Sequence, residues 1–111
     1  MEKNKKLQVR LSKDFNLDLE EVYQYGIETF GLQQAESYEN EIWQLVKRLS
    51  YNYLLFPECR YLTTKSKMYR WIILDSHLII YCITEKEVQI LRVLNSKRSI
   101  AKIRTSRGIK L

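Results

Sequence analysis

Four residue types are scarce in this sequence, and the shortage of Cys and His argues against two kinds of site. The 111 residues include one Pro, three Gly, two Cys and one His. Cys59 and Cys82 form no CxxC pair and no His cluster accompanies them, which favours two free thiols in a reducing cytosol over a disulfide or a metal site. We therefore expect no metal and no other cofactor. No internal repeat or low-complexity linker is present either.

Long apolar runs are also missing. The longest uncharged apolar run is far too short to cross a bilayer, and no apolar segment follows the basic start MEKNKK, so a membrane protein and a secretory signal are both excluded. Hydrophobic residues make up 45% of the chain and aromatic residues 12%, which excludes disorder. The length suits a single modest core. We predict one cytoplasmic domain over residues 1–111, with a basic tail from about residue 95.

Acidic residues are absent from the end of the chain. Residues 14–50 hold eight acidic and two basic side chains, whereas residues 51–111 hold twelve basic and four acidic ones. From Arg92 to Leu111 there are seven Lys or Arg and no acid. Such a charge distribution attracts nucleic acid or an acidic protein segment. A solvated tail without a specific partner is the alternative.

The second half of the chain contains three short apolar runs. YRWIIL, LIIYCIT and VQILRVL follow one another from Tyr69, separated by three polar residues each. Connections that short join antiparallel strands but not parallel ones. Near the start, LQVRLS alternates apolar and polar residues, which predicts a half-buried strand. A further short edge strand is expected around Tyr61 to Thr63.

Two helical segments, DLEEVYQYGIETFG and QQAESYENEIWQLVKRL, lie between the first strand and the later ones. Asp14 or Asn16 is expected to cap the first helix, since a short side-chain oxygen accepts a bond from an unpaired N–H of the first turn. Gly31 suits the helix stop, because only Gly adopts a left-handed conformation without steric cost. Pro57 ends the helical region.

This element order predicts an α+β fold: an N-terminal strand, then an antiparallel helical hairpin packed on a small antiparallel sheet, in the order β-α-α-β-β-β. The helices carry apolar residues every three or four positions. We expect the hairpin to bury its apolar stripe against the strands or their immediate neighbours. The expected hairpin residues are Val22, Phe30, Tyr38, Ile42, Leu45 and Leu49, and the expected strand residues are Trp71, Ile73, Ile80 and Leu91.

The order and spacing of these pieces resemble the RelE/ParE superfamily of small toxins from toxin–antitoxin pairs, from about Leu7 to Arg98. DLEEVYQY followed by FGLQQAESY matches helical-hairpin residues that are usual in the ParE branch. The YR at Tyr69, the Tyr in LIIY and the run LRVLNSKR match the strand elements. Two departures are Glu58-Cys59-Arg60 after the Pro, where small or Gly-rich residues are common, and Asn95 where a His is frequent.

The resemblance implies one of two activities. In the RNA-cutting branch, cleavage of messenger RNA in the ribosome needs a base, cations for the phosphate and an acid for the leaving oxygen. Lys67, Arg70 and Arg92 are the catalytic candidates, but no Tyr, His, Glu or Asp follows Val93 to act as the acid. His77, in the DSH connection, suits a turn or surface position. Arg70 and Arg92 are equally well explained by pairing with acids of the helical hairpin or of a neighbouring chain.

The ParE branch is the closer match, and it implies a plasmid-stabilising toxin that inhibits DNA gyrase by holding the enzyme on cleaved DNA, without a reaction of its own. The expected partners are a cognate acidic antitoxin and gyrase, or the ribosome and mRNA in the alternative, and the expected assembly is a homodimer or a toxin–antitoxin hetero-oligomer. A small basic nucleic-acid-binding domain is the remaining alternative. Residues expected to bind the target or antitoxin are Arg70, Arg92, Lys97, Arg98, Lys102 and Arg104.

Overall fold

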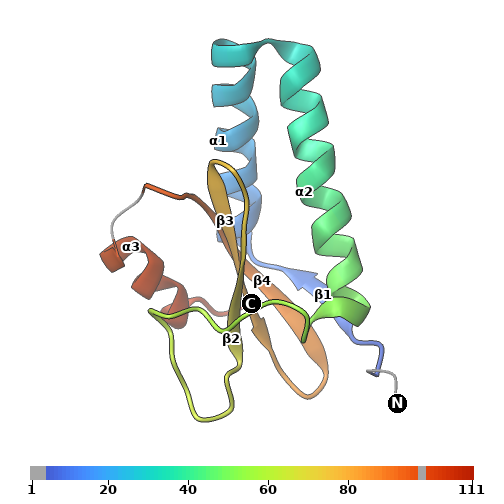
Figure 1. The fold of residues 1–111 in the computed structure, drawn as a ribbon, viewed down its shortest axis with the longest axis vertical. Coiled ribbons are helices and arrows are strands. Elements are labelled where there is room, and N and C mark those ends of the chain that lie inside the picture. The colour runs from blue at the N-terminus through green and yellow to red at the C-terminus, as the bar shows by residue number, and fades with distance from the viewer. Residues whose placement is uncertain (1–4, 98–99) are drawn as a thin grey trace.

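The computed structural model describes residues 5–97 and 100–111 and contains a strand, two long helices, three strands and a short C-terminal helical segment (Figure 1). The two long helices stand side by side and rise beyond the sheet. The predicted α+β order of a strand, two helices and three strands is confirmed. The elements are β1 (Gln8–Leu11), α1 (Lys13–Phe30), α2 (Leu32–Asn52), β2 (Tyr69–Ile73), β3 (His77–Ile83), β4 (Glu87–Asn95), α3 (Ile100–Arg104) and the 3-10 helix η1 (Thr105–Gly108).

The four strands form one sheet in the order β1-β4-β3-β2. β2, β3 and β4 pair antiparallel, as their short connections predict. β1 pairs parallel to β4, so the sheet is mixed rather than wholly antiparallel. The hairpin of α1 and α2 supplies the long crossover that a parallel pair requires.

The ends of the helices explain how the hairpin is built. Ser12 caps α1, because its hydroxyl accepts a hydrogen bond from the N–H of Phe15, so the prediction of Asp14 or Asn16 was wrong by a few residues. Gly31 is the only residue between the helices, and its φ of 94° is a conformation that favours Gly. At Gly26 an added Cβ would lie 3.2 Å from the Cβ of Ala35, which shows how closely the two helices approach.

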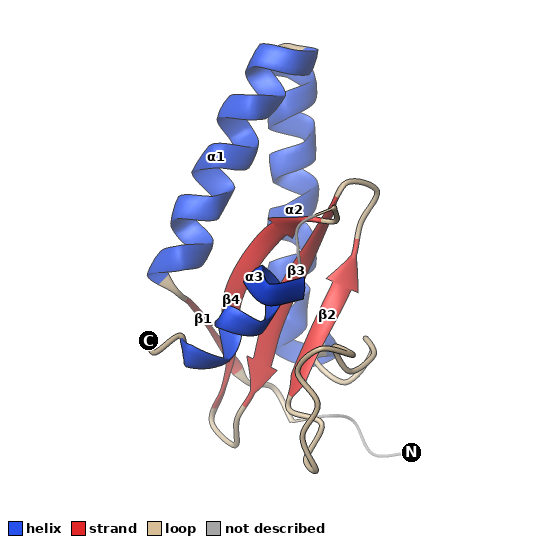
Figure 2. Cartoon of the chain, turned by 90° about the vertical axis from the view of Figure 1, so that its left-hand side faces the viewer, coloured by secondary structure: helices blue, strands red, loops and turns tan. Residues whose placement is uncertain are grey.

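The sheet is covered on both faces (Figure 2). On the hairpin face, strand residues such as Ile79 and Tyr81 pack against Ile42 and Leu49 of α2. We call the opposite face the tail face. There, α3 and the connection before β2 cover the strand residues that alternate with Ile79 and Tyr81, such as Ile80. Trp71, Ile80 and Leu91 point to the tail face. The hairpin therefore packs on the immediate neighbours of these three residues rather than on the residues themselves.

Two sequence-based expectations were wrong. Phe30 is 63% exposed, because it lies at the hairpin tip, beyond the edge of the sheet (Figure 1). Ile73 is itself 62% exposed at the end of the edge strand β2, but its immediate neighbour Ile72 is buried in the hairpin-face core, as the expectation allowed. No strand forms at residues 61–63. The pairing at the edge of β2 comes instead from a single bridge between Glu58 and Arg70.

The expected basic tail is folded where the structure describes it. Ile103 of α3 is buried, and Ile109 and Leu111 pack against the same tail-face core. The tail thus combines an apolar inner side with an exposed cationic outer side. Among the described residues, no helix is both long enough and apolar enough to cross a membrane.

Candidate functional site

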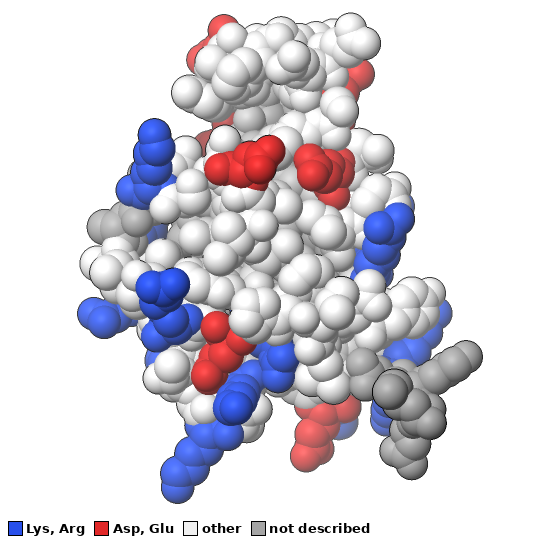
Figure 3. Space-filling model, in the orientation of Figure 1, with Lys and Arg blue, Asp and Glu red and all other residues white. Residues whose placement is uncertain are grey.

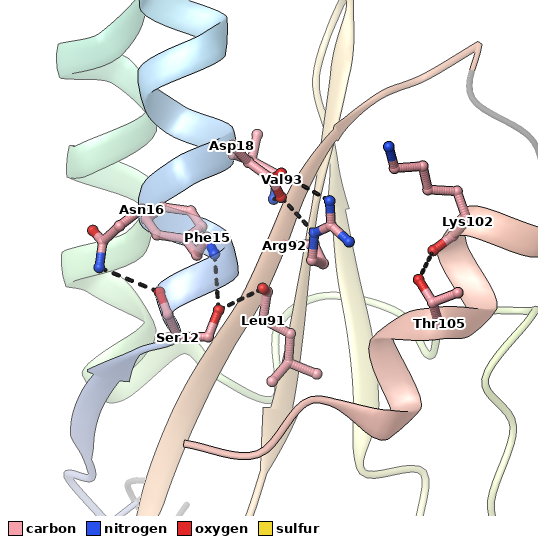
Figure 4. A network of polar contacts seen from close by, with 9 residues as sticks. All are labelled: Ser12, Phe15, Asn16, Asp18, Leu91, Arg92, Val93, Lys102 and Thr105. Atoms are coloured by element: carbon pink, nitrogen blue, oxygen red, sulfur yellow. Dashed lines mark hydrogen bonds and ion pairs between the residues drawn. The ribbon is translucent and has the colours of Figure 1, made fainter.

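A network of polar contacts lies along the edge of β4 (Figure 4). β1 ends at Leu11, opposite Ile90, so β4 continues without a strand on that side. Ser12 takes over the pairing: its N–H donates to the carbonyl of Ile90 at 2.9 Å, and its hydroxyl donates to the carbonyl of Leu91 at 2.6 Å. The same hydroxyl accepts from Phe15 at the start of α1. One serine therefore fixes where the helix begins on the sheet.

Asp18 continues this edge one helical turn further on. Its carboxylate accepts two hydrogen bonds from Arg92, from Nε at 2.6 Å and from Nη2 at 2.8 Å. It also accepts the N–H of Val93 at 3.2 Å. The side chains of Arg92 and Asp18 are 14% and 11% exposed, and the hydrogen bond to Asp18 raises the pKa of Arg92. Arg92 is thus held rigidly and its charge is neutralised by an acid of the hairpin.

Arg70 has a different set of partners. Its Nη1 donates to the carbonyls of Leu54 and Phe56, at 3.2 and 2.8 Å, and its Nε donates to the carbonyl of Lys67 at 3.3 Å. These carbonyls flank the connection from α2 to β2. Arg70 therefore fastens that connection to the sheet, and all three of these partners are backbone carbonyls rather than acids. Lys67 is exposed, with a φ of 56°.

The three catalytic candidates do not converge on one site. Arg70 pairs with Tyr81, a residue of the hairpin face, while Arg92 pairs with Ile80 of the tail face. Cross-strand partners share a face, so the two arginines belong to opposite faces, on strands separated by β3. They cannot grip one phosphate together.

The remaining binding candidates lie around the end of β4. Lys97 is exposed just after β4, and Arg104 is exposed on α3. Lys102 is half-buried and lines a cavity of about 400 Å³ together with Asp18 and Arg92. Arg98 lies outside the described residues.

This cavity continues into a larger hollow of about 880 Å³ beside the hairpin, and together we call them the hairpin groove. The two parts share four lining residues, Val22, Tyr25, His77 and Asn95. Phe30 lies at the far end. The groove is mixed in charge, because its lining includes both acids and cations. The acids are Asp18, Glu21, Glu41 and Asp75, and the cations are Arg92, Lys97 and Lys102.

His77 stands at the centre of the groove. It is the first residue of β3, it is only 9% exposed, and its Nδ1 shares a hydrogen bond of 2.8 Å with the hydroxyl of Tyr38 on α2. Burial lowers the pKa of His77 and raises that of Tyr38. The expected turn or surface position was therefore wrong. In the structure His77 alternates with Ile79 and Tyr81 along β3, so it shares their hairpin face, which the uniformly apolar sequence of β3 did not reveal.

The two thiols do not form a reactive pair. Cys59 and Cys82 are both free and buried in the tail-face core, and burial raises the pKa of Cys82 to about 11. In the part of the chain that the structure describes, no three His, Cys, Asp or Glu side chains are grouped to hold a metal ion. The site chemistry is therefore that of hydrogen bonds, charges and exposed aromatic rings.

Comparison with known proteins agrees with this architecture. Residues 9–100 match the family model described as the ParE toxin of the type II toxin–antitoxin system parDE. The chain belongs to the ParE toxin family. No curated protein sequence is significantly similar to it.

Two solved structures show the fold of this ParE family member. A chain of the chromosomal ParDE toxin–antitoxin system from P. aeruginosa has a TM-score of 0.68 and 19% identity, covering 83% of this chain and 98% of that one. A conserved hypothetical protein from Helicobacter pylori has a TM-score of 0.54 and 22% identity, covering 83% and 97%. At these identities the likeness concerns the fold alone.

Proposed function

We propose that this ParE family member is a toxin that inhibits DNA gyrase through contact, rather than a messenger RNA nuclease. The observation that carries the proposal is the pairing of Arg92 with Asp18, at 2.6 and 2.8 Å. A cation that stabilises a phosphate in a transition state must be free to meet the charge that develops there. Arg92 is already neutralised by a carboxylate.

The separation of the other candidates supports the same proposal. Arg70 is bound to backbone carbonyls on the opposite side of the sheet from Arg92. Proton transfer by a positioned acid commonly contributes about 10²- to 10⁴-fold to a reaction. No Tyr, His, Asp or Glu follows Val93 in the sequence, so an acid is missing at the expected place.

The experiment compares the two targets with one protein preparation. Purified chain is added to gyrase with relaxed plasmid, and separately to ribosomes translating a defined message. We expect loss of supercoiling and accumulation of cleaved plasmid bound to gyrase, with the message intact. Cleavage of the message at fixed positions, with supercoiling unchanged, would replace this proposal by the nuclease interpretation.

Charge substitutions identify the contacting surface in that assay. Substituting the exposed Lys97 and Arg104 together with Ala should weaken gyrase inhibition by about tenfold, because complementary charges speed association. Lys47→Ala/Arg48→Ala on α2 is the matched control, since it removes the same charge from exposed positions. Equal losses in both variants would show that only net charge matters.

The same proposal includes a cognate antitoxin bound in the hairpin groove. Its wall offers two exposed aromatic side chains, Tyr25, 59% exposed, and Phe30, 63% exposed. Exposed aromatic residues at a concave site are typical of residues that dominate binding energy. Because the groove lining is mixed in charge, apolar contact contributes more to this interface than general attraction between a basic toxin and an acidic partner.

Two tyrosines of nearly equal exposure test this part. Tyr25→Ala should weaken binding of the protein encoded by the neighbouring reading frame by about tenfold or more, whereas Tyr51→Ala, 55% exposed and outside the groove, should leave it within about twofold. Titration calorimetry measures both. If the antitoxin bound both variants with equal affinity, the proposal that it binds in the hairpin groove would be contradicted. Because gyrase acts on chromosomal DNA, we also propose a cytoplasmic location.

A further inference from the structure

Two arginines outside the candidate site lie over aromatic rings on the tail face. The guanidinium of Arg60 is 5.8 Å from the ring centre of Tyr61 and 6.0 Å from that of Trp71. The guanidinium of Arg107 is 5.4 Å from the ring centre of Tyr69. Both arginines are exposed, while the rings beneath them are buried or half-buried. Each cation is therefore supported from below and open to solvent above.

These two arginines belong to one surface made from two distant segments. Arg107 donates from Nη2 to the carbonyl of Thr63 at 3.4 Å, which joins η1 to the connection before β2. Tyr61, Tyr69 and Ile109 pack against the same tail-face core. Figure 2 shows both segments on the same side of the sheet. We call this the stacked-arginine surface, made of Arg60, Lys65, Lys67, Arg107 and Lys110, all exposed.

The charge of this surface is not balanced locally, in contrast to Arg92. Glu58 is the single acid in residues 58–69, and its carboxylate accepts the N–H of Thr64 at 3.1 Å. Residues 100–111 contain no acid. Figure 3 shows most of the visible Lys and Arg below the hairpin, and most of the visible Asp and Glu in the upper part of the view. The field of the stacked-arginine surface therefore attracts a polyanion.

Stacking also suits these arginines to phosphate. A guanidinium within about 6 Å of a ring centre is attracted to the ring, which restricts its motion, so less conformational entropy is lost on binding. Arg107 commits one Nη2 donor to the carbonyl of Thr63, which leaves the other donors of its planar fork for a ligand. The fork matches two phosphate oxygens at once.

The form of the polyanion follows from the same geometry. Proteins that hold single strands offer open aromatic faces on which bases stack. Here guanidinium groups lie over the three rings, so the surface offers charge rather than faces for unpaired bases. A duplex needs only phosphate contacts, because its bases are already stacked. We propose that the stacked-arginine surface binds the phosphate backbone of duplex DNA, independently of any action on gyrase.

The test uses the full chain, made by cell-free synthesis, and a fluorescent 24-base-pair duplex without gyrase. Anisotropy titrations at several salt concentrations compare the natural chain with Arg60→Gln/Arg107→Gln. The matched control, Lys47→Gln/Arg48→Gln, makes the same change in net charge on exposed positions of α2. We expect Arg60→Gln/Arg107→Gln to weaken binding by about tenfold or more and to reduce the slope of log K against log salt by about 2. The control should change affinity less than threefold.

A second variant keeps the test decisive if the first unfolds, which thermal melting will show. Arg60→Lys/Arg107→Lys retains the charge but not the fork, so it should bind at least about threefold more weakly with a nearly unchanged salt slope. Affinity equal to the natural chain in this variant would overturn the role of the stacked guanidinium groups.

Three further results would overturn the proposal: no duplex binding by the natural chain, equal losses in the Gln variant and its control, or tighter binding of one strand of the same sequence. Binding of an acidic peptide in place of DNA, with the same dependence on Arg60 and Arg107, would assign the surface to a protein partner.

Discussion

The two faces of the sheet differ in what covers them. The hairpin face lies under two helices of 18 and 21 residues, whereas the tail face lies under a helix of five residues and an irregular connection. Both faces bury apolar strand residues. The long helices bring enough apolar surface to build the fold, while the short cover brings exposed cations. The hairpin face thus contributes most of the covering apolar surface, and the tail face carries more of the exposed charge.

A matched pair of core substitutions gives the largest expected difference between the faces. Ile42→Ala on the hairpin face should lower the free energy of unfolding by about 2–5 kcal/mol, because both transfer energy and packing are lost. Ile103→Ala on the tail face removes the same side chain, but a five-residue helix can undock locally. We expect less than half the loss, measured by urea denaturation. Equal losses would show that the two faces form one cooperative core.

Asp18 joins the hairpin to the sheet edge, and its loss is the next largest effect. Asp18→Ala leaves the charge of Arg92 without its partner and the N–H of Val93 without an acceptor, and should cost about 3 kcal/mol. Asp14→Ala, an exposed acid in the first turn of the same helix, should cost less than about 1 kcal/mol. Similar costs would mean that Asp18 acts only through the helix dipole. Thermal melting of both variants measures the difference.

Ser12 has a smaller share in the same junction. Ser12→Ala removes the cap of α1 and the donor to Leu91, so we expect a loss of about 1–2 kcal/mol. Ser37→Ala, on the exposed side of α2, should change stability by less than about 0.5 kcal/mol. A Ser12→Ala variant as stable as the natural chain would contradict the role of the cap.

His77 gives the smallest expected effect, and it depends on pH. Burial lowers its pKa below the ordinary value of about 6.5, so the unfolded chain binds more protons between the two values. Stability is therefore complete above about pH 6.5 and falls as the pH drops toward the folded pKa. His77→Gln should lack this part of the loss. Because His77 is the only histidine, the difference in melting temperature between the two proteins at pH 7.5 and pH 5 isolates it. An unchanged difference would mean that the ring is not desolvated.

The sequence predicted the elements better than their faces. Short connections and apolar runs identified the strands, but β3 is apolar on both sides, so alternation could not tell which side meets the hairpin. The pairing of β3 with β4 also contains a register shift between Ile80 and Tyr81, which no sequence pattern predicted.

The candidate site shows the same limit. Pairing of Arg92 with a hairpin acid was one of two equal interpretations, because Asp18 and Arg92 are 74 positions apart and only the folded chain brings them together. The cap at Ser12 was missed because it depends on where β1 ends. Arg60 and Arg107 were not candidates at all, since only the folded chain brings Arg60 to Trp71 and Arg107 to Tyr69.

The most direct test of the account is to replace the charged pair by a neutral one. Asp18→Asn/Arg92→Gln retains hydrogen-bonding groups at both positions but removes the cation that a nuclease would need. If Arg92 serves the fold, the double variant should inhibit purified gyrase within about threefold of the natural chain, since no interaction with the target is lost. A double variant that melts as a folded protein but neither inhibits gyrase nor arrests growth would contradict the account and return Arg92 to the active surface.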